Sequence, residues 1–315
     1  MLIEDVKKAA YLLKTNNNYC FLCHKNLDGD AFGACYALKY ALEQLGKNSV
    51  VRTYNGEFVE KFADLCSVKK YESCNFKIEN YVTVDVADLS LLEEEFSKTN
   101  IFLCIDHHKT NKVSAKFKCI DFSAAACCEI IYNILKELNV KITKHIANCL
   151  YLGVASDSGC FKFDNTTAKT HRIAADLIEK GADFADINFK IFDCKTVEKL
   201  NLEKEIIENL KFYFNGAVAI VFITEQIIKK TNATKEDCSS VSNIAAAIDK
   251  VLVAITAKEE ENFFKISVRS KKGFDASSFC AKFGGGGHER AAGCLIKGEQ
   301  EFVLKELHKA LKGEF

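Results

Sequence analysis

Short apolar runs alternate with longer amphipathic stretches along the first part of the chain. The short runs have the length and composition of buried strands: Tyr19–Cys23, Ser49–Tyr54, Tyr81–Val84 and Ile101–Ile105. Apolar residues at positions 35, 38, 41, 42 and 45 are spaced by three and four, which predicts a helix that ends at Gly46. Comparable patterns predict helices at 3–14, 89–98, 124–138, 142–155 and 167–180. Strands that alternate with helices indicate βαβ units and a parallel sheet.

The second part of the chain has a different texture. A charged amphipathic stretch at 195–211 is of the kind that connects two bodies. After it, the pattern predicts strands at 217–223, 251–256 and 263–268, a helix at 242–248, and an acidic turn at Lys258–Asn262. We therefore expect an α/β protein with a larger domain at residues 1–190, a helical linker at 191–212 and a smaller domain at 213–315.

The charge balance and the apolar runs exclude two classes of protein. The chain has 43 Lys and Arg residues against 43 Asp and Glu residues, so its formal net charge is zero. Such a balance argues against a protein that coats long nucleic acid through bulk positive charge. The longest apolar runs fall far short of the roughly 18–20 residues that span a bilayer, and residues 1–5 include no apolar signal segment. We expect a cytoplasmic protein with no membrane partner.

The chain contains fifteen cysteines, which are scattered through apolar segments. An odd number without a secretory signal does not indicate a disulfide framework. The one Cys-x-x-Cys sequence, Cys20 to Cys23, lies in a predicted strand and has no second pair at zinc-finger spacing. We expect most of these thiols to pack as small buried hydrophobic groups.

Carboxylate and imidazole side chains follow the predicted strands, where ligands bind in an open parallel sheet. Four separate segments supply them: His24 with Asp28 and Asp30; Asp85; Asp106 with His107 and His108; and, after a helix, Asp157. One Asp after a strand is most often a helix cap, but so many carboxylates in one place would repel one another unless cations neutralised them. Oxygen ligands with some imidazole suit Mn²⁺, Mg²⁺ or a similar ion. Six or seven ligands are too many for one ion and predict a pair of metals.

Five motifs make the sequence recognisable. They are His24-Lys25-Asn26-Leu27-Asp28-Gly29-Asp30, the lone Asp85, Asp106-His107-His108-Lys109-Thr110-Asn111, Ala155-Ser156-Asp157-Ser158-Gly159, and Gly284-Gly285-Gly286-Gly287-His288. Together they resemble the DHH superfamily of phosphoesterases, in the DHH–DHHA1 branch of bacterial nanoRNase/pAp phosphatases and cyclic-dinucleotide phosphodiesterases. The resemblance implies a parallel-sheet DHH domain with flanking helices, a smaller α/β DHHA1 domain, and an active site in the cleft between them.

The resemblance also implies a role for each position. His24 and Asp28 would bind one metal, Asp30, His107 and Asp157 would bind the other, and Asp85 would bridge the two. Asp106 would be an orienting residue or an additional ligand, and His108 would contact the phosphate and stabilise the transition state. The sequence departs from the family at Ala126-Cys127-Cys128, where hydroxyl residues are frequent, which puts the hydrogen bonds around the ligands in doubt. No metal-ligand position is lost.

The glycine-rich motif is the candidate substrate site of the second domain. Consecutive glycines let backbone amides approach a phosphate closely, although such a run can also be a flexible turn. By resemblance, this loop would hold the base or the terminal phosphate of the substrate, through Gly285, Gly286, Gly287, His288 and Arg269.

We therefore expect a phosphoesterase that uses two divalent cations, Mn²⁺ as the first choice and Mg²⁺ as the second, to activate water. Its substrates would be short oligoribonucleotides and 3′-phosphoadenosine 5′-phosphate (pAp). A phosphodiesterase for cyclic di-AMP or pApA is the alternative, because the ligand residues cannot separate the two. A nucleotide-binding regulator without turnover is disfavoured by the complete ligand set, and an inorganic pyrophosphatase by the glycine motif. Family members are often homodimers, but nothing in the sequence marks an interface.

Overall fold

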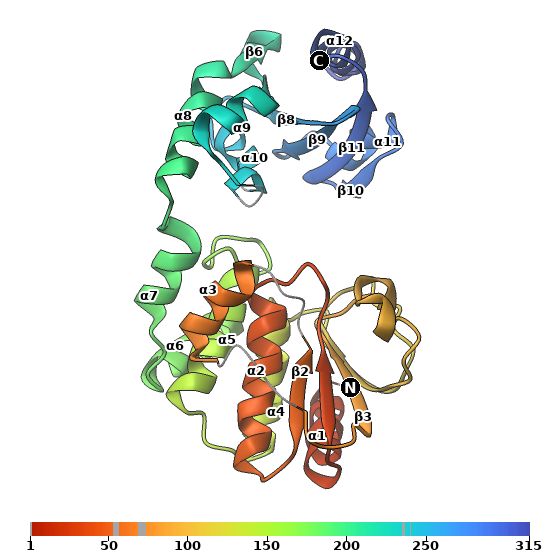
Figure 1. The fold of residues 1–315 in the computed structure, drawn as a ribbon, viewed down its shortest axis with the longest axis vertical. Coiled ribbons are helices and arrows are strands. Elements are labelled where there is room, and N and C mark those ends of the chain that lie inside the picture. Colours follow the sequence, from red (N-terminus) through yellow and green to blue (C-terminus); the bar gives the residue numbers. More distant parts are fainter. Residues whose placement is uncertain (1, 53–56, 69–73, 235–236, 240) are drawn as a thin grey trace. The chain divides into compact units, whose positions relative to one another are not determined.

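The protein consists of two compact units, Met1–Cys194 and Lys195–Phe315, here called unit 1 and unit 2. The computed structural model describes residues 2–52, 57–68, 74–234, 237–239 and 241–315 (Figure 1). Within those residues, no helix has both the length and the apolar character needed to cross a membrane.

Unit 1 contains a five-stranded sheet in which every neighbouring pair is parallel, as predicted. Its strand order is β2-β1-β3-β4-β5. The strands are β1 (Tyr19–Leu22), β2 (Ser49–Arg52), β3 (Asn80–Val84), β4 (Ile101–Asp106) and β5 (Ala115–Ile120). The order reverses direction between β1 and β3, and such a switch point opens a crevice at the carboxyl ends of the strands.

The helices of unit 1 include five of the six predicted ones and two others. They are α1 (Leu2–Thr15), α2 (Gly29–Gln44), α3 (Glu57–Cys66), α4 (Cys127–Glu137), α5 (Lys144–Asp157), α6 (Ala168–Glu179) and α7 (Phe184–Asn188). A short π-helical turn follows at Phe189–Asp193. The sequence pattern predicted neither α3 nor α7.

Two predictions for unit 1 need correction. The helix expected at 89–98 is instead a pair of 3₁₀ turns, Leu89–Leu91 and Glu94–Phe96. Leu92 between them is extended, with ψ 166°, which places its side chain in a small cluster under the sheet. The strand expected at 49–54 ends at Arg52, and the last two residues of that prediction lie outside the described part of the chain. Strand β5 was not predicted. Its half-buried positions alternate with exposed lysines, and only Cys119 is fully buried, so it lacks the apolar run of the other strands.

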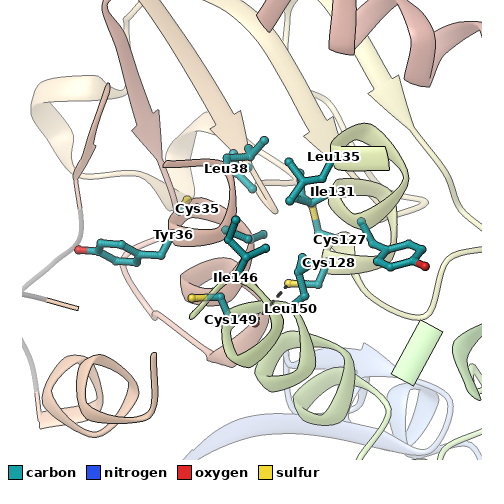
Figure 2. Packing of buried hydrophobic residues seen from close by; sticks show 14 of the residues in the cluster. Cys35, Tyr36, Leu38, Cys127, Cys128, Ile131, Leu135, Ile146, Cys149 and Leu150 are labelled. Atoms are coloured by element: carbon teal, nitrogen blue, oxygen red, sulfur yellow. Dashed lines mark hydrogen bonds between the residues drawn. The ribbon is translucent and has the colours of Figure 1, made fainter. Parts of the chain in front are cut away.

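The main core of unit 1 lies between α2, α4 and α5 (Figure 2). Leu38 of α2, Ile131 of α4 and Ile146 of α5 are among the apolar side chains that meet there. Most cysteines of the chain are buried, which confirms that they pack as small apolar groups.

Two glycines let these helices approach closely. A Cβ on Gly33 of α2 would lie 2.1 Å from the carbonyl oxygen of Cys149 in α5. A Cβ on Gly153 of α5 would lie 2.5 Å from Asp30 Oδ1. Because real Cβ atoms do not come so near, the glycines keep the start of α2 against the end of α5.

Unit 2 contains a six-stranded mixed sheet of order β10-β11-β9-β8-β7-β6, in which only β7 and β8 pair in parallel. The strands are β6 (Lys211–Tyr213), β7 (Val218–Ile223), β8 (Val253–Glu260), β9 (Phe263–Ser270), β10 (Gly286–His288) and β11 (Ala291–Lys297). The helices are α8 (Val197–Asn209), α9 (Glu225–Thr231), α10 (Ser242–Ala246), α11 (Ala276–Ala281) and α12 (Gln300–Leu311). These elements confirm a second, mixed α/β domain.

Two features of unit 2 differ from the elements that the sequence pattern predicts. Strand β8 continues to Glu260, so the turn before β9 is shorter than the predicted Lys258–Asn262. Helix α8, in the charged stretch, buries Leu202 and Ile206 in one cluster with Val221 of β7, so it packs as part of unit 2.

Candidate metal centre

The first group of candidate ligands joins β1 to the start of α2. His24 follows β1, and its Nε2 lies 3.5 Å from Asp28 Oδ2 and 3.6 Å from Asp85 Oδ2. Asp28 is also the N-cap of α2, because its Oδ1 accepts hydrogen bonds from the amides of Asp30 and Ala31. One carboxylate oxygen therefore holds the helix while the other faces His24.

Asp85 lies at the centre of the site, directly after β3. It is only 2% exposed, and its backbone is left-handed, with φ +59°. Asp tolerates this conformation better than most residues, and strained backbone of this kind clusters at functional sites. Its amide donates to the carbonyl oxygen of Ile105, at 3.0 Å, which fixes it to β4. While Oδ2 faces His24, Oδ1 lies 3.5 Å from His107 Nε2.

The second group consists of Asp30, His107 and Asp157. His107 follows β4, Asp30 is in the first turn of α2, and Asp157 is the last residue of α5. His107 Nε2 lies 3.2 Å from Asp157 Oδ2 and 4.0 Å from Asp30 Oδ2. The ring is oriented by its other nitrogen, since Nδ1 donates to the carbonyl oxygen of Ala124 at 3.2 Å.

Asp30 is fully buried and is held by the start of α4. The amides of Cys127 and Cys128 donate to its two carboxylate oxygens at 2.5 and 2.9 Å. A carboxylate at a helix N-terminus is favourable, because free amides and the helix dipole both point at it. The hydrogen bonds that the missing hydroxyl residues put in doubt are thus supplied by the backbone.

Asp106 forms hydrogen bonds with three neighbours, His107, His108 and Asn111. Its Oδ1 accepts from the Nδ1 of His108 at 2.7 Å, and from the amide of His107 at 2.8 Å. Its Oδ2 accepts from Asn111 Nδ2 at 2.6 Å. This arrangement leaves Nε2 of His108, a side chain that is 42% exposed, as the ring atom available to a ligand. The Asp106 hydrogen bond raises the pKa of His108 above its ordinary value.

The electrostatics of the site call for positive charge. Burial lowers the pKa of His24, but hydrogen bonds to Asp28 and Asp85 outweigh it and raise the pKa to about 10. Burial raises the pKa of Asp157 to about 6, although the neighbouring His107 ring acts to lower it. Burial, with the nearby charge of Asp157, also raises the pKa of Asp30 well above its usual range. Protons bound to His24, Asp157 and Asp30 offset part of the negative charge of the carboxylates. Divalent cations would neutralise the same charge in place of these protons.

The side chains fit divalent cations. There are three groups of residues in which the potential ligand atoms of each group lie within 4.8 Å of one another. They are His24, Asp28 and Asp85; Asp30, His107 and Asp157; and Asp85, His107 and His108. Asp85 Oδ1 and His107 Nε2 are buried and have no hydrogen-bond partner among the described residues. Buried polar atoms are rarely left so, and carboxylate oxygens with imidazole nitrogens form a suitable donor set for such ions.

The predicted substrate residues of unit 2 lie together at one edge of its sheet. Gly286 and His288 are exposed on β10, which pairs antiparallel with β11. His288 and Arg269 are both in register with Ala291, one on each side of it. Residues in register point to the same face, so two long polar side chains flank a small one.

Two of the glycines also have a packing reason. A Cβ on Gly285 would lie 2.2 Å from the carbonyl oxygen of Gly293, and one on Gly287, where φ is +148°, would lie 2.6 Å from that of Ala291. A Cβ on Gly286 would meet nothing within 4 Å. Gly285 and Gly287 are therefore explained by the close approach of β11, whereas Gly286 has open space above it.

Comparison with known protein families decides the classification. Residues 18–154 match the DHH family, N-terminal domain, and residues 215–313 match the DHHA1 domain. The chain thus contains a DHH domain followed by a DHHA1 domain. The DHH match contains five of the six predicted metal ligands and ends in α5 just before the sixth, Asp157, while the DHHA1 match contains both Arg269 and His288.

Similar proteins extend over nearly all of this DHH–DHHA1 chain. A Thermus thermophilus protein named bifunctional oligoribonuclease and PAP phosphatase NrnA is 26% identical over 302 residues, covering 94% of this chain and 89% of its own. A Mycoplasma genitalium protein of the same name is 25% identical, covering 94% of each. The crystal structure of an exopolyphosphatase-related protein from Bacteroides fragilis shares the fold, with a TM-score of 0.85, 22% identity and coverage of 98% and 96%.

The structure thus brings all six predicted metal ligands together and places Asp106 and His108 beside them. The sequence analysis assigned no role to Asn111. An amide side chain a few residues after the His107-His108 pair is close enough to turn back to Asp106, and this position was the available signal. The amides of Cys127 and Cys128 were missed because backbone donors leave no mark in the sequence.

Proposed function

We propose that this protein is a metal-dependent phosphoesterase that hydrolyses short oligoribonucleotides and pAp. The observation that carries the proposal is the position of Asp85 between two groups of potential ligands. Its Oδ2 faces His24 of the first group, and its Oδ1 faces His107 of the second. The names of the two relatives, which cover nearly the whole chain, support the substrates.

The two groups would each hold one divalent cation. His24 and Asp28 would bind the first, Asp30, His107 and Asp157 the second, and Asp85 both. Bound cations would polarise a phosphoryl oxygen and lower the pKa of water, which is the chemistry that phosphoester hydrolysis requires. A mixed set of carboxylates and imidazoles favours Mn²⁺ over Mg²⁺, because Mg²⁺ prefers oxygen ligands alone.

His108 would contact the substrate phosphate. The carboxylate of Asp106 fixes the ring through Nδ1, and Asn111 in turn fixes that carboxylate. The raised pKa of His108 favours the imidazolium, whose charge suits a phosphate that becomes more negative as the bond to the leaving group breaks. The His108 nitrogen that faces the ligand cluster is Nδ1, which lies 3.5 Å from Asp85 Oδ1. Because this nitrogen already donates to Asp106, we assign His108 to the substrate and not to a metal.

Unit 2 would recognise the substrate. Arg269 and His288 stand on either side of Ala291 on one face of the sheet, a spacing that leaves room for a planar base or a phosphate between them. Gly286, which has open space at its Cβ position, would let a phosphate approach the backbone. These contacts bind the part of the substrate that does not react, so they act mainly on KM.

The decisive experiment compares substrates on one preparation. The protein is stripped of metal with EDTA, reconstituted with Mn²⁺ or Mg²⁺, and assayed for kcat/KM on RNAs of two to five nucleotides, pAp, pApA and cyclic di-AMP. We expect turnover of the short RNAs and pAp, higher with Mn²⁺ and absent in EDTA. Preference for cyclic di-AMP or pApA would instead support the alternative phosphodiesterase, and a lack of turnover with either metal would indicate a nucleotide-binding regulator.

A further inference from the structure

Two of the three ligands of the second group, Asp30 and His107, form hydrogen bonds with one short backbone segment, Ala124–Cys128. The carbonyl oxygen of Ala124 accepts from His107 Nδ1, and the amides of Cys127 and Cys128 donate to Asp30. The segment connects β5 to α4, so two ligands from distant parts of the chain are aligned on the same piece of backbone.

Asn165 connects the third ligand, Asp157, to this segment. Its Nδ2 lies 3.0 Å from the carbonyl oxygen of Ala125 and 3.0 Å from that of Asp157. An amide nitrogen carries two hydrogens, so one side chain can donate to both carbonyls. Asp157 ends α5, and a carbonyl at a helix C-terminus has no partner within the helix. Asn165 therefore ties the end of α5 to the backbone that holds the other two ligands.

The loop that carries Asn165 is shaped to return it to this place. Gly159, Cys160 and Phe161 follow one another in the left-handed region, with φ of 56°, 57° and 64°. Non-glycine residues adopt this conformation only where the surroundings fix it. Here the amide of Phe161 donates to the Oγ of Ser158 at 3.0 Å, and the ring of Phe161 stacks on His171. The chain thus reverses immediately after α5 and returns to its last residue.

We propose that Asn165 is a positioning residue for the Asp30–His107–Asp157 group. This inference rests on the proposed function, since it assumes that the group holds a cation. Ligands must be held to within about 0.5 Å of their working positions. Among the described residues, Asp157 is the one member of the group that has no direct hydrogen bond to Ala124–Cys128, and Asn165 connects it to that segment. Within the described part of the chain, Asn165 has no hydrogen bond to the His24–Asp28–Asp85 group.

The test is a calorimetric titration of the metal-free full chain with Mn²⁺. We expect two binding events for the wild type. Asn165→Ala should weaken one of them by about 10-fold, the lower end of the effect of residues that orient metal ligands, and leave the other within twofold. Asn165→Asp keeps the shape of the side chain and removes both N–H donors, so it should act in the same way. Asn209→Ala, which removes an exposed bond from Nδ2 to the carbonyl oxygen of Glu205, is the control and should change neither event.

Two ligand variants assign the effect to one site. In a His24→Ala background, Asn165→Ala should still weaken the remaining Mn²⁺, whereas in an Asp157→Ala background it should change nothing further. The melting temperature of the metal-free protein should stay within a few degrees of wild type. Equal weakening of both events, no weakening of either, or an effect that persists without Asp157 overturns the inference. A wild type that binds no Mn²⁺ overturns the proposed function itself.

Discussion

The two units hold their candidate functional groups in opposite ways. In unit 1, Asp30 and Asp85 are buried, and atoms such as Asp85 Oδ1 lack a hydrogen-bond partner among the described residues. In unit 2, Gly286 and His288 are exposed, and the strand that carries them is already paired with β11. Such buried atoms of unit 1 lack partners within the described part of the chain, whereas the exposed residues of unit 2 lie on a strand whose backbone is already hydrogen-bonded.

This difference separates chemistry from recognition. Buried carboxylates that face one another are costly unless a cation completes them, so the arrangement in unit 1 has a physical reason only if metal binds. Exposed residues on a strand that is already paired, such as Gly286 and His288, carry no such desolvation cost. We therefore expect substitutions in unit 1 to lower kcat and metal binding, and substitutions in unit 2 to raise KM.

The largest effect is expected for Asp85→Asn. The change removes the shared carboxylate charge but keeps its shape, and Asn tolerates the left-handed φ of this position. Because a metal pair supplies several kcal/mol of transition-state stabilisation, kcat should fall by at least about 1,000-fold. The assay is steady-state hydrolysis of a dinucleotide with Mn²⁺, with circular dichroism to show that the variant is folded. Retained turnover would refute the bridging role.

His108→Ala tests whether unit 1 separates metal ligands from substrate contacts. Asp106 already occupies its Nδ1, so we expect both Mn²⁺ affinities to remain within about twofold of wild type. The loss of one phosphate contact should lower kcat by roughly 100-fold. Titration calorimetry and steady-state kinetics on the same samples measure the two quantities. A lost Mn²⁺ would instead make His108 a ligand.

His288→Ala tests the other half of the comparison. We expect KM for a dinucleotide to rise by about 10-fold, equivalent to one lost hydrogen bond to a charged group, while kcat stays within about threefold. The exposed Lys297→Ala, on β11 of the same sheet, is the matched control. An unchanged KM, or a fall in kcat alone, would remove His288 from substrate binding.

The smallest effect is expected from a pair of glycine variants. Gly287→Ala places a Cβ against the Ala291 carbonyl at a φ of +148°, so it should destabilise the protein by about 1 kcal/mol. Gly286→Ala meets nothing within 4 Å and should change the free energy of unfolding by less than about 0.5 kcal/mol. Urea denaturation measures both. Equal destabilisation would show that the packing account of Gly287 is wrong.

The metal ligands were predictable because they obey a simple rule. His24, Asp85 and His107 each follow a parallel strand, and parallel strands deliver their carboxyl ends to one edge. The helix at 89–98 failed because the pattern of apolar residues does not show that Leu92 is extended. Spacing predicts which face is apolar, not where the backbone must bend to bury it.

The supporting contacts could not be predicted in the same way. Asp30 is held by the amides of Cys127 and Cys128, and any residues there would offer the same backbone donors. Asn165 donates to two carbonyls that are 40 and 8 residues away, and no local pattern reports such a contact. Side chains that touch the ligand follow from chemistry and topology, whereas those that orient them follow from packing.

The most direct test of two cations around Asp85 is anomalous diffraction at the manganese absorption edge, on crystals of the wild-type protein grown with Mn²⁺. The account predicts two peaks in unit 1, one beside His24 and Asp28 and one beside Asp30, His107 and Asp157, with Asp85 contacting both. A single peak, or peaks that lie away from Asp85, would contradict it.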